Sequence, residues 1–175
     1  MIGQEAMKRI NYGKAGLTAA MAVYGIICAR DVTISRFLDR VDLIVHEAGH
    51  LFFSWFGEFV QVMGGTIGQL LVPLGIAGYF FFRKEQFSFS IVLFWIGQNL
   101  FNISVYVKDA QEMVLPLVSI GGGEDTLHDW NYLLLHTGLL RWDQQIGSFV
   151  YGLGLLVMTA SVVMAGYWAF ERTEE

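Results

Sequence analysis

The sequence predicts an all-α membrane protein, a polytopic bundle of four or five transmembrane helices. Three observations support this prediction. Hydrophobic residues make up 54% of the 175 residues and charged residues only 15%, well below the roughly 25% charged residues of soluble domains. The mean hydropathy is high, at +0.48. Several apolar stretches are also about as long as a membrane helix.

Charge and cysteine content exclude other classes of protein. The 11 lysines and arginines are outnumbered by 16 acidic residues, so the net charge is −5, and nucleic acid is not an expected partner. The single cysteine, Cys28, excludes an intrachain disulfide and a zinc cluster built from cysteines. The expected environment is the lipid bilayer, with a multi-pass location in the cell membrane. No repeat or linker divides residues 1–175, so one domain is predicted.

Two apolar stretches predict the first two helices. Residues 16–29 are short for a span, but they lack a convincing small-residue cleavage site, so we expect an uncleaved helix. The charged segment that follows offers Thr33 or Ser35 as a helix N-cap. Residues 41–63 then have the length of a membrane helix, and Gly64-Gly65 is expected to break it.

Three further segments complete the predicted bundle. Residues 66–82 are apolar but hold a proline and three glycines, so this segment is open to crossing, kinking or re-entering the membrane. Residues 87–107 are long enough to cross. The polar stretch 108–143 contains a short interfacial helix near residues 130–140, and residues 146–170 form the final span.

The motif His46-Glu47-Ala48-Gly49-His50 lies inside the second predicted helix. Residues four apart share one face of a helix, so both imidazoles can reach one tetrahedral Zn²⁺. Glu47 is placed to act as general base toward a water that the metal has made more acidic. Ionisable side chains in an apolar helix are costly unless they are paired or functional. The motif therefore indicates a zinc site with hydrolytic chemistry.

An H-E-x-x-H motif in a membrane helix of a small polytopic chain resembles the site-2-protease-like intramembrane zinc metallopeptidases. The resemblance covers about residues 41–110, and the motif is its only specific part. It implies a helical catalytic core and a zinc ion held by His46, His50 and an aspartate from a later helix. It also implies Glu47 as the catalytic base and membrane-embedded segments of other proteins as substrates.

The third zinc ligand implied by this resemblance has two candidates. The aspartate of the family usually lies in an Asn…Leu-Asp-Gly pattern, and this chain has no Leu-Asp-Gly. The nearest counterpart is Asp109, which follows Asn99 and Asn102, and the runner-up is Asp129 in the polar stretch. Each has a structural alternative, because Asp109 can pair with Lys108 at the membrane interface and Asp129 can cap a helix.

Whether Asp109 can bind the same metal ion as the histidines depends on which helices cross the membrane. If residues 41–63, 66–82 and 87–107 all cross, Asp109 lies roughly 20 Å or more from the motif, at 1.5 Å per residue. Re-entry of residues 66–82 would remove this mismatch. A ligand from a loop that folds back into the bundle would also remove it. We predict Asp109, with Asp129 close behind.

Two asparagines of the fourth segment, Asn99 and Asn102, are polar side chains that need partners in hydrocarbon. They lie three residues apart, on one helical face. One hypothesis is that they hydrogen-bond a substrate or an oxyanion. The other is that they tie this helix to its neighbours.

Three functions are compatible with the sequence. The leading hypothesis is a zinc-dependent intramembrane endopeptidase. The second is a catalytically silent structural or accessory subunit of a larger membrane assembly, favoured by the missing Leu-Asp-Gly and the small size. A metal or proton transporter is weaker, because transport sites often lie between repeated halves and this chain has no repeat.

Overall fold

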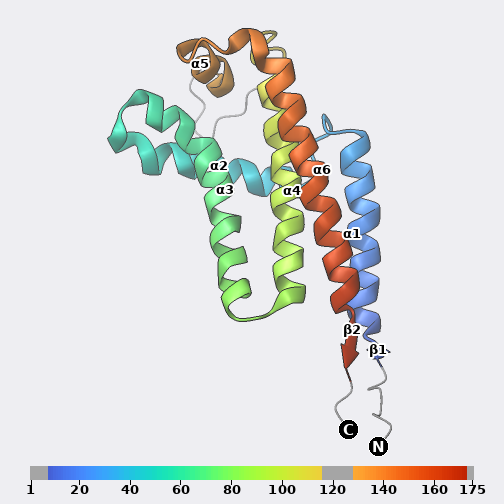
Figure 1. Ribbon diagram of the computed structural model, residues 1–175. Coiled ribbons are helices and arrows are strands. Elements are labelled where there is room, and N and C mark those ends of the chain that lie inside the picture. The colour runs from blue at the N-terminus through green and yellow to red at the C-terminus, as the bar shows by residue number, and fades with distance from the viewer. Residues whose placement is uncertain (1–7, 116–127, 173–175) are drawn as a thin grey trace, which may run out of the picture.

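The computed structural model of the protein describes residues 8–115 and 128–172, and it is an all-α membrane bundle, as predicted. In this described part, four helices are long and apolar enough to cross a membrane. They are α1 (Tyr12–Arg30), α3 (Glu58–Phe82), α4 (Gln86–Lys108) and α6 (Asp143–Trp168). Figure 1 shows these helices side by side. The predicted first, fourth and final spans agree with α1, α4 and α6 to within about one turn.

Shorter elements lie around these four helices. They are α2 (Phe37–Phe53), α5 (Asp129–His136), the 3₁₀ turns η1 (Ser54–Phe56) and η2 (Leu140–Trp142), and the strands β1 (Lys8–Ile10) and β2 (Phe170–Arg172). The two strands pair antiparallel, so the described ends of the chain meet at one end of the bundle. In Figure 1, α2 runs across the direction of the four long helices, and α5 lies at the end opposite the termini.

The prediction of one membrane helix over residues 41–63 is wrong. Helix α2 ends at Phe53, a 3₁₀ turn follows, and Gly57 at φ 89° leads into α3. Glycine adopts a positive φ without the steric cost that other residues meet, so Gly57 provides the break. Gly64 and Gly65 instead lie inside α3, where they are buried.

The mismatch of roughly 20 Å between Asp109 and the motif was expected if the helix that carries the motif crosses the membrane. That helix is α2, which is not one of the described helices that are long and apolar enough to span a membrane. Residues 66–82 belong to the 25-residue α3, which is continuous through Pro73 and is long and apolar enough to cross a membrane. Because α3 and α4 both run the length of the bundle, the HEAGH motif and the C-terminal end of α4 lie toward the same end (Figure 1).

The N-terminus of α2 is also organised differently from the prediction. Neither Thr33 nor Ser35 caps the helix, which begins after Arg36. The backbone N–H of Arg36 donates to Oδ2 of Asp39 at 2.7 Å. A carboxylate in the first turn satisfies an otherwise unpaired amide and interacts favourably with the helix dipole.

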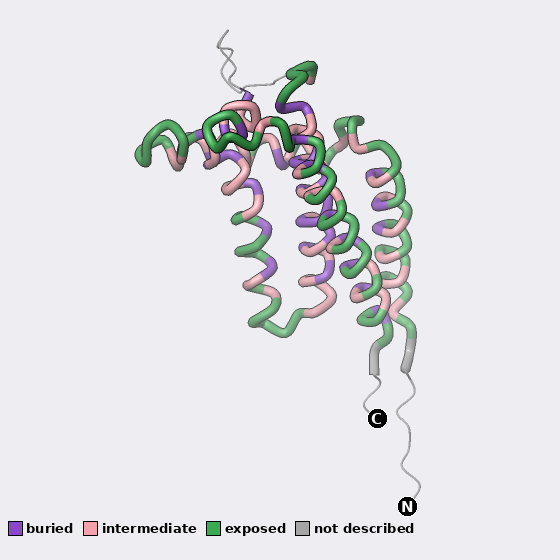
Figure 2. The backbone as a smooth tube through the Cα atoms, turned by 45° about the horizontal axis from the view of Figure 1, so that its top comes forward, coloured by how far each residue is buried: buried purple, intermediate pink, exposed green. Residues whose placement is uncertain are grey.

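Helix α4 is the most buried of the four long helices, and Figure 2 shows buried residues along much of its length. It packs closely on α6 through glycines: a Cβ at Gly97 would lie 2.9 Å from Cβ of Met158, and one at Gly154 would lie 3.0 Å from the carbonyl oxygen of Gly97. Phe94 and Phe101 of α4 complete this core with Met158. Polar side chains on the inner faces of α4 are therefore in the protein interior and not in lipid.

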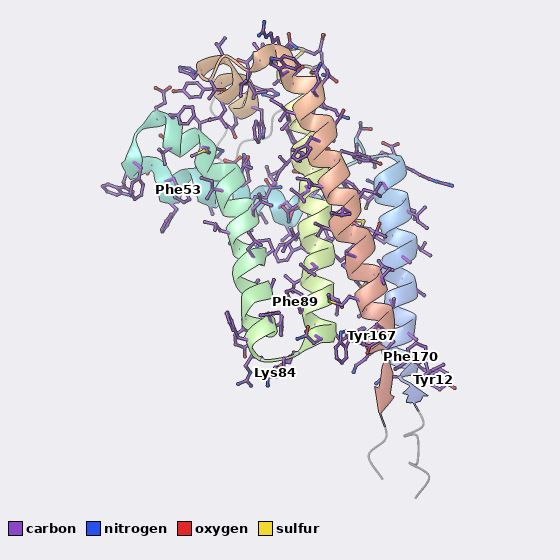
Figure 3. The ribbon with its side chains drawn as sticks, viewed as in Figure 1. Tyr12, Phe53, Lys84, Phe89, Tyr167 and Phe170 are labelled. Carbon is purple, nitrogen blue, oxygen red and sulfur yellow. The ribbon has the colours of Figure 1, made fainter. Side chains whose placement is uncertain are left out.

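Aromatic side chains mark the end of the bundle where the termini lie (Figure 3). Tyr12, Tyr167 and Phe170 are exposed there, and Lys84 lies at the turn between α3 and α4 at the same end. Tyrosine concentrates at membrane–water interfaces, and lysine extends its amine toward water. This pattern is the one expected where the bundle leaves the bilayer.

One carboxyl group, that of Asp42 in α2, is buried against α4 with 1% of its surface exposed. Its Oδ1 accepts from the indole N–H of Trp95 at 2.7 Å. Among the described residues, its Oδ2 and the side-chain oxygens of Gln98 and Asn99 are buried without a hydrogen-bond partner. Burial raises the pKa of Asp42 to about 7. The charge of the neighbouring Asp39 also raises this pKa, whereas the hydrogen bond from Trp95 lowers it.

Because of this raised pKa, the folded protein should lose stability as the pH rises, and Asp42→Asn should remove this loss. Between about pH 4 and pH 7 the unfolded chain releases the Asp42 proton while the folded protein keeps it, so stability falls as the pH rises. An asparagine has no proton to lose, and its amide can donate to the unpartnered oxygens. We expect the melting temperature of Asp42→Asn in detergent to exceed that of the wild type by roughly 5 °C at pH 8, with little difference at pH 4.

The matched control is Asp31→Asn, because Asp31 is exposed in the turn after α1. It should show no comparable gain at pH 8. A difference between Asp42→Asn and the wild type that is the same at pH 4 and pH 8 would contradict the assignment of the cost to Asp42.

Candidate metal centre

The HEAGH motif lies on the part of α2 that faces α3. The rings of His46 and His50 are one turn apart, with centroids separated by 4.6 Å. One nitrogen from each ring and one carboxylate oxygen of Glu47 all lie within 4.8 Å of one another. These three side chains form a group of the size that can surround one metal ion.

Glycines bring α3 against this group. A Cβ at Gly49 would collide with the carbonyl oxygen of Gly64, and a Cβ at Gly65 would lie 2.6 Å from Nε2 of both His46 and His50. Residues without side chains are therefore required where the two helices touch. The sequence predicted that Gly64-Gly65 would break a helix. In the structure, these two glycines instead allow α3 to pack directly against α2 and the two imidazoles.

The carboxylate of Asp129, the first residue of α5, reaches the two histidines. Its Oδ2 lies 2.8 Å from Nε2 of His46 and 2.9 Å from Nε2 of His50. Burial alone would raise the pKa of Asp129, but hydrogen bonds from the two imidazoles outweigh it and the pKa is lowered. Burial would likewise lower the pKa of His50, but the hydrogen bond and charge of Asp129 raise it overall.

Hydrogen bonds at the other ring nitrogen fix how each imidazole is presented. Nδ1 of His50 lies 2.8 Å from the backbone carbonyl oxygen of Gln61, which can only accept, so this nitrogen carries the hydrogen. Nδ1 of His46 lies 3.1 Å from Oε1 of Gln69. In the neutral rings, the lone pairs are then on the two Nε2 atoms that face Asp129, and each Nε2 donates to Asp129 only when its ring is protonated.

This donor set fits zinc. Two lone pairs and a carboxylate oxygen in contact repel one another unless protons or a cation lie between them. Ligands at 2.0–2.1 Å from a tetrahedral zinc are about 3.3 Å apart, which is within about half an ångström of the 2.8 and 2.9 Å separations here. Small side-chain shifts would therefore admit the ion, with His46, His50 and Asp129 as ligands.

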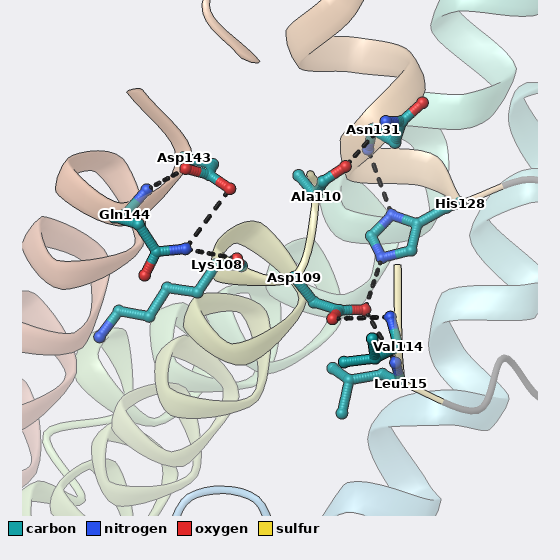
Figure 4. A network of polar contacts seen from close by, with 9 residues as sticks. All are labelled: Lys108, Asp109, Ala110, Val114, Leu115, His128, Asn131, Asp143 and Gln144. Carbon is teal, nitrogen blue, oxygen red and sulfur yellow. Dashed lines mark hydrogen bonds and ion pairs between the residues drawn. The ribbon is translucent and has the colours of Figure 1, made fainter. Parts of the chain in front are cut away.

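The other candidate ligand, Asp109, lies elsewhere, in a buried network after α4 (Figure 4). Its two oxygens accept from the backbone N–H groups of Val114 and Leu115, each at 3.0 Å, and Oδ2 also contacts Nε2 of His128 at 3.1 Å. Of the two candidates, the structure brings only Asp129 to the histidines, and the identity of the third ligand stays a prediction.

Asp109 nevertheless contributes to the placement of Asp129. Its partner His128 caps α5, because Nδ1 of His128 accepts from the backbone N–H of Asn131 at 3.2 Å. The Asn131 side chain donates to the carbonyl oxygen of Ala110 at 2.7 Å. These contacts hold the start of α5 against the end of α4. His128, and not Asp129, therefore takes the capping role, which leaves the Asp129 carboxylate free for the histidines.

The asparagines of α4 lie in the interior. Asn102 donates to Oδ1 of Asp39 at 3.2 Å and accepts from Gln69 at 3.0 Å. Asn99 is fully buried and donates to the backbone carbonyl of Trp95 at 3.3 Å. These contacts are the ones expected if the amides tie α4 to its neighbours. A contact with substrate or oxyanion stays a prediction.

The sequence did not single out Gln69, Gln61 or Gly65 as parts of the site. Gln69 lies one turn after Gly65 on α3, so both face α2. Its polarity within an apolar helix was the signal that could have identified it. Gln61 contributes only a backbone carbonyl, which no sequence pattern reports.

An apolar hollow adjoins the motif on the exposed side of α2. It has a volume of about 510 Å³ and is lined by Ala48, Leu51, Phe52, Trp55 and Phe56. Trp55 is 89% exposed. Ala48, Leu51 and Phe52 share one face of α2, and this face points away from His46 and His50.

Comparisons of the chain with models of protein families, with curated proteins and with solved structures give no match.

Proposed function

We propose that this protein is a zinc-dependent endopeptidase of the cell membrane that hydrolyses peptide bonds in membrane-embedded segments of other proteins. The observation that carries the proposal is the approach of Asp129 Oδ2 to within 2.9 Å of Nε2 of both His46 and His50, with a carboxylate oxygen of Glu47 within 4.8 Å of a nitrogen of each histidine. Catalytic zinc sites use three protein ligands and keep the fourth position open for water or substrate. Two histidines and one carboxylate are such a set.

The roles of the side chains follow from their positions. When bound, zinc would polarise the scissile carbonyl and make a water molecule more acidic. Among the described residues, no side chain hydrogen-bonds the Glu47 carboxylate, so Glu47 can accept the proton of the attacking water and pass it to the leaving amine. Both histidines are held by their Nδ1 contacts, so they do not need to reorient during the reaction.

The membrane-spanning character of the bundle supports a membrane-embedded segment as the substrate. The peptide bonds of a helix are already hydrogen-bonded and shielded, so the segment must unwind locally before a carbonyl reaches the site. We therefore expect helix-breaking residues near the scissile bond to favour cleavage.

The test is cleavage by purified protein in liposomes, with a panel of single-span peptides that carry glycine or proline at varied depths. We expect about one zinc per chain and cleavage products detectable by mass spectrometry. Glu47→Gln should keep the zinc and lose at least about a thousandfold in rate, within the range of general acid–base catalysis. The control Glu85→Gln, at the far turn between α3 and α4, should cleave normally.

The outcomes separate the proposal from its main alternative. Full cleavage by zinc-loaded Glu47→Gln would contradict the general-base assignment. A wild-type preparation without zinc, whose assembly is indifferent to His46→Ala, would favour a structural or accessory subunit of a larger membrane assembly.

A further inference from the structure

We infer that Asp39, acting through Asn102 and Gln69, is a positioning residue that fixes the tautomer and orientation of His46. The inference rests on the metal binding of the proposed function, and it assigns a role to buried polar side chains that the mechanism above does not use. Neither Asp39 nor the two groups between it and His46 touches the proposed position of the metal. Their effect would pass through one imidazole.

The physical link is a continuous row of hydrogen bonds through three helices. Oδ1 of Asp39 on α2 accepts from Nδ2 of Asn102 on α4 at 3.2 Å. Oδ1 of Asn102 accepts from Nε2 of Gln69 on α3 at 3.0 Å. Oε1 of Gln69 then lies 3.1 Å from Nδ1 of His46, two turns after Asp39 on α2. We call these three side chains, Asp39, Asn102 and Gln69, the amide relay.

The carboxylate at the start sets the direction of the whole relay. An ionised carboxylate only accepts, so Asn102 must present its NH₂ group to Asp39 and its oxygen to Gln69. Gln69 must then present its own NH₂ group to Asn102 and its oxygen to His46. Each amide alone could be turned either way, but the row as a whole has one consistent orientation. It ends with a hydrogen on Nδ1 of His46.

Asp39 is itself held in place by further donors. Gln98 donates to Oδ1 at 2.6 Å, and the backbone N–H of Arg36 donates to Oδ2 at 2.7 Å. Together with Asn102, these donors occupy both oxygens of Asp39 and hold its carboxyl group in one orientation. The start of the relay is therefore fixed by the N-terminus of α2 and by α4 together.

The consequence for the metal is that Nε2 of His46 keeps its lone pair. Ligating histidines commonly donate their other N–H to a carboxylate or carbonyl, which fixes the ring and raises its basicity as a ligand. His50 has a backbone acceptor, the carbonyl of Gln61, whereas His46 depends on side chains. The two ligands should therefore respond differently to mutation of the relay.

The first experiment measures metal affinity of the full-length protein in detergent, by competition between the protein and a chelator for Co²⁺ or Zn²⁺. Gln69→Met removes the acceptor, and we expect its affinity to fall by roughly 10- to 100-fold. Gln69→Glu restores an acceptor for Nδ1 of His46 and should recover most of the affinity. The visible spectrum of bound Co²⁺ should change in Gln69→Met and not in Gln69→Glu.

The matched control is Asn99→Leu, which alters a fully buried amide of α4 that lies outside the relay. Its melting temperature is expected to fall, but its metal affinity should stay within a few-fold of the wild type. This comparison separates a general loss of packing from a loss of histidine positioning.

The second experiment reads the tautomer directly and does not depend on Gln69→Met folding. In metal-free Asp129→Ala protein labelled with ¹⁵N-histidine at pH 9, where no carboxylate competes at Nε2, His46 should carry its hydrogen on Nδ1 as long as Asp39 is present. Asp39→Asn removes the fixed acceptor and should populate the other tautomer of His46, while His50 stays unchanged as an internal reference.

The outcomes are distinct. Unchanged Co²⁺ affinity and spectrum in Gln69→Met, or an unchanged His46 tautomer in Asp39→Asn, would overturn the relay while leaving the endopeptidase proposal intact. A wild-type protein that binds neither metal would overturn both.

Discussion

Replacing Asp129 with alanine is expected to remove the metal, whereas the same change at Asp109 should leave the metal bound. The Asp129 carboxylate oxygen contacts both Nε2 atoms, so its loss would take away one of the three proposed ligands. We expect the zinc affinity to fall by more than about a hundredfold, beyond the effect of losing a partner of a ligating histidine. Cleavage should become undetectable. Zinc content after equilibration with a chelator, measured alongside cleavage, checks both results.

Asp109→Ala should act on stability more than on the metal. It removes the acceptor of two backbone N–H groups and of His128, at a cost of about 2–3 kcal/mol for hydrogen bonds to a charged group. The start of α5 would loosen, so a loss of about tenfold in zinc affinity is expected through Asp129.

A third aspartate serves as the control for this pair. Asp143 is fully buried at the start of α6, where it accepts from Gln111 at 2.8 Å and does not contact the histidines. Asp143→Ala should lower the melting temperature without releasing zinc. If Asp109→Ala released the zinc completely and Asp129→Ala retained it, the ligand suggested by the family resemblance would be correct and the assignment to Asp129 wrong.

A single methyl group at Gly65 is expected to inactivate the site. The new Cβ would lie 2.6 Å from Nε2 of both His46 and His50, so the rings must turn aside. Side-chain ends can move at low energetic cost, and the fold should survive. The ligand geometry would not, since a displacement of about 1 Å can cost a hundredfold in rate. Gly65→Ala should therefore keep its helical circular dichroism but lose zinc affinity and cleavage by roughly a hundredfold.

The same helix provides the comparison for this change. A Cβ at Gly75 has no atom within 4 Å, and alanine favours a helix over glycine by up to about 1 kcal/mol. Gly75→Ala should match or slightly exceed the wild type in melting temperature and should cleave normally. Normal zinc binding by Gly65→Ala would show that α3 does not sit against the imidazoles as described.

The fold was largely predictable because the length of an apolar stretch is a local property of the sequence. The segments that became α1, α4 and α6 were each identified from their length and composition. The break after α2 was not, because a glycine pair can either end a helix or let two helices touch. Only the structure shows that Gly57 has the positive φ and that Gly64-Gly65 lies in a contact.

Only those residues of the candidate site that lie close together in the sequence could be predicted. His46, Glu47 and His50 lie within one turn of helix, so their spacing alone indicates shared chemistry. Asp129 lies 83 residues after His46, and its approach depends on α2 not spanning and on the contacts of His128 with Asp109. Gln69 belongs to no motif, and its role depends on the packing of three helices. Such long-range pairings are set by tertiary structure, which a single sequence does not report.

The long separation in sequence between the proposed ligands His46 and Asp129 has a consequence for folding. A metal held by both His46 and Asp129 would cross-link points 83 residues apart, much as a disulfide does, in a chain whose single cysteine is buried and free. Closing so long a loop restricts the unfolded chain strongly. During synthesis the cross-link can form only after α3 and α4 have been made, because Asp129 follows them. The proposed metal site would thus be completed late, once the helices around it are already in place.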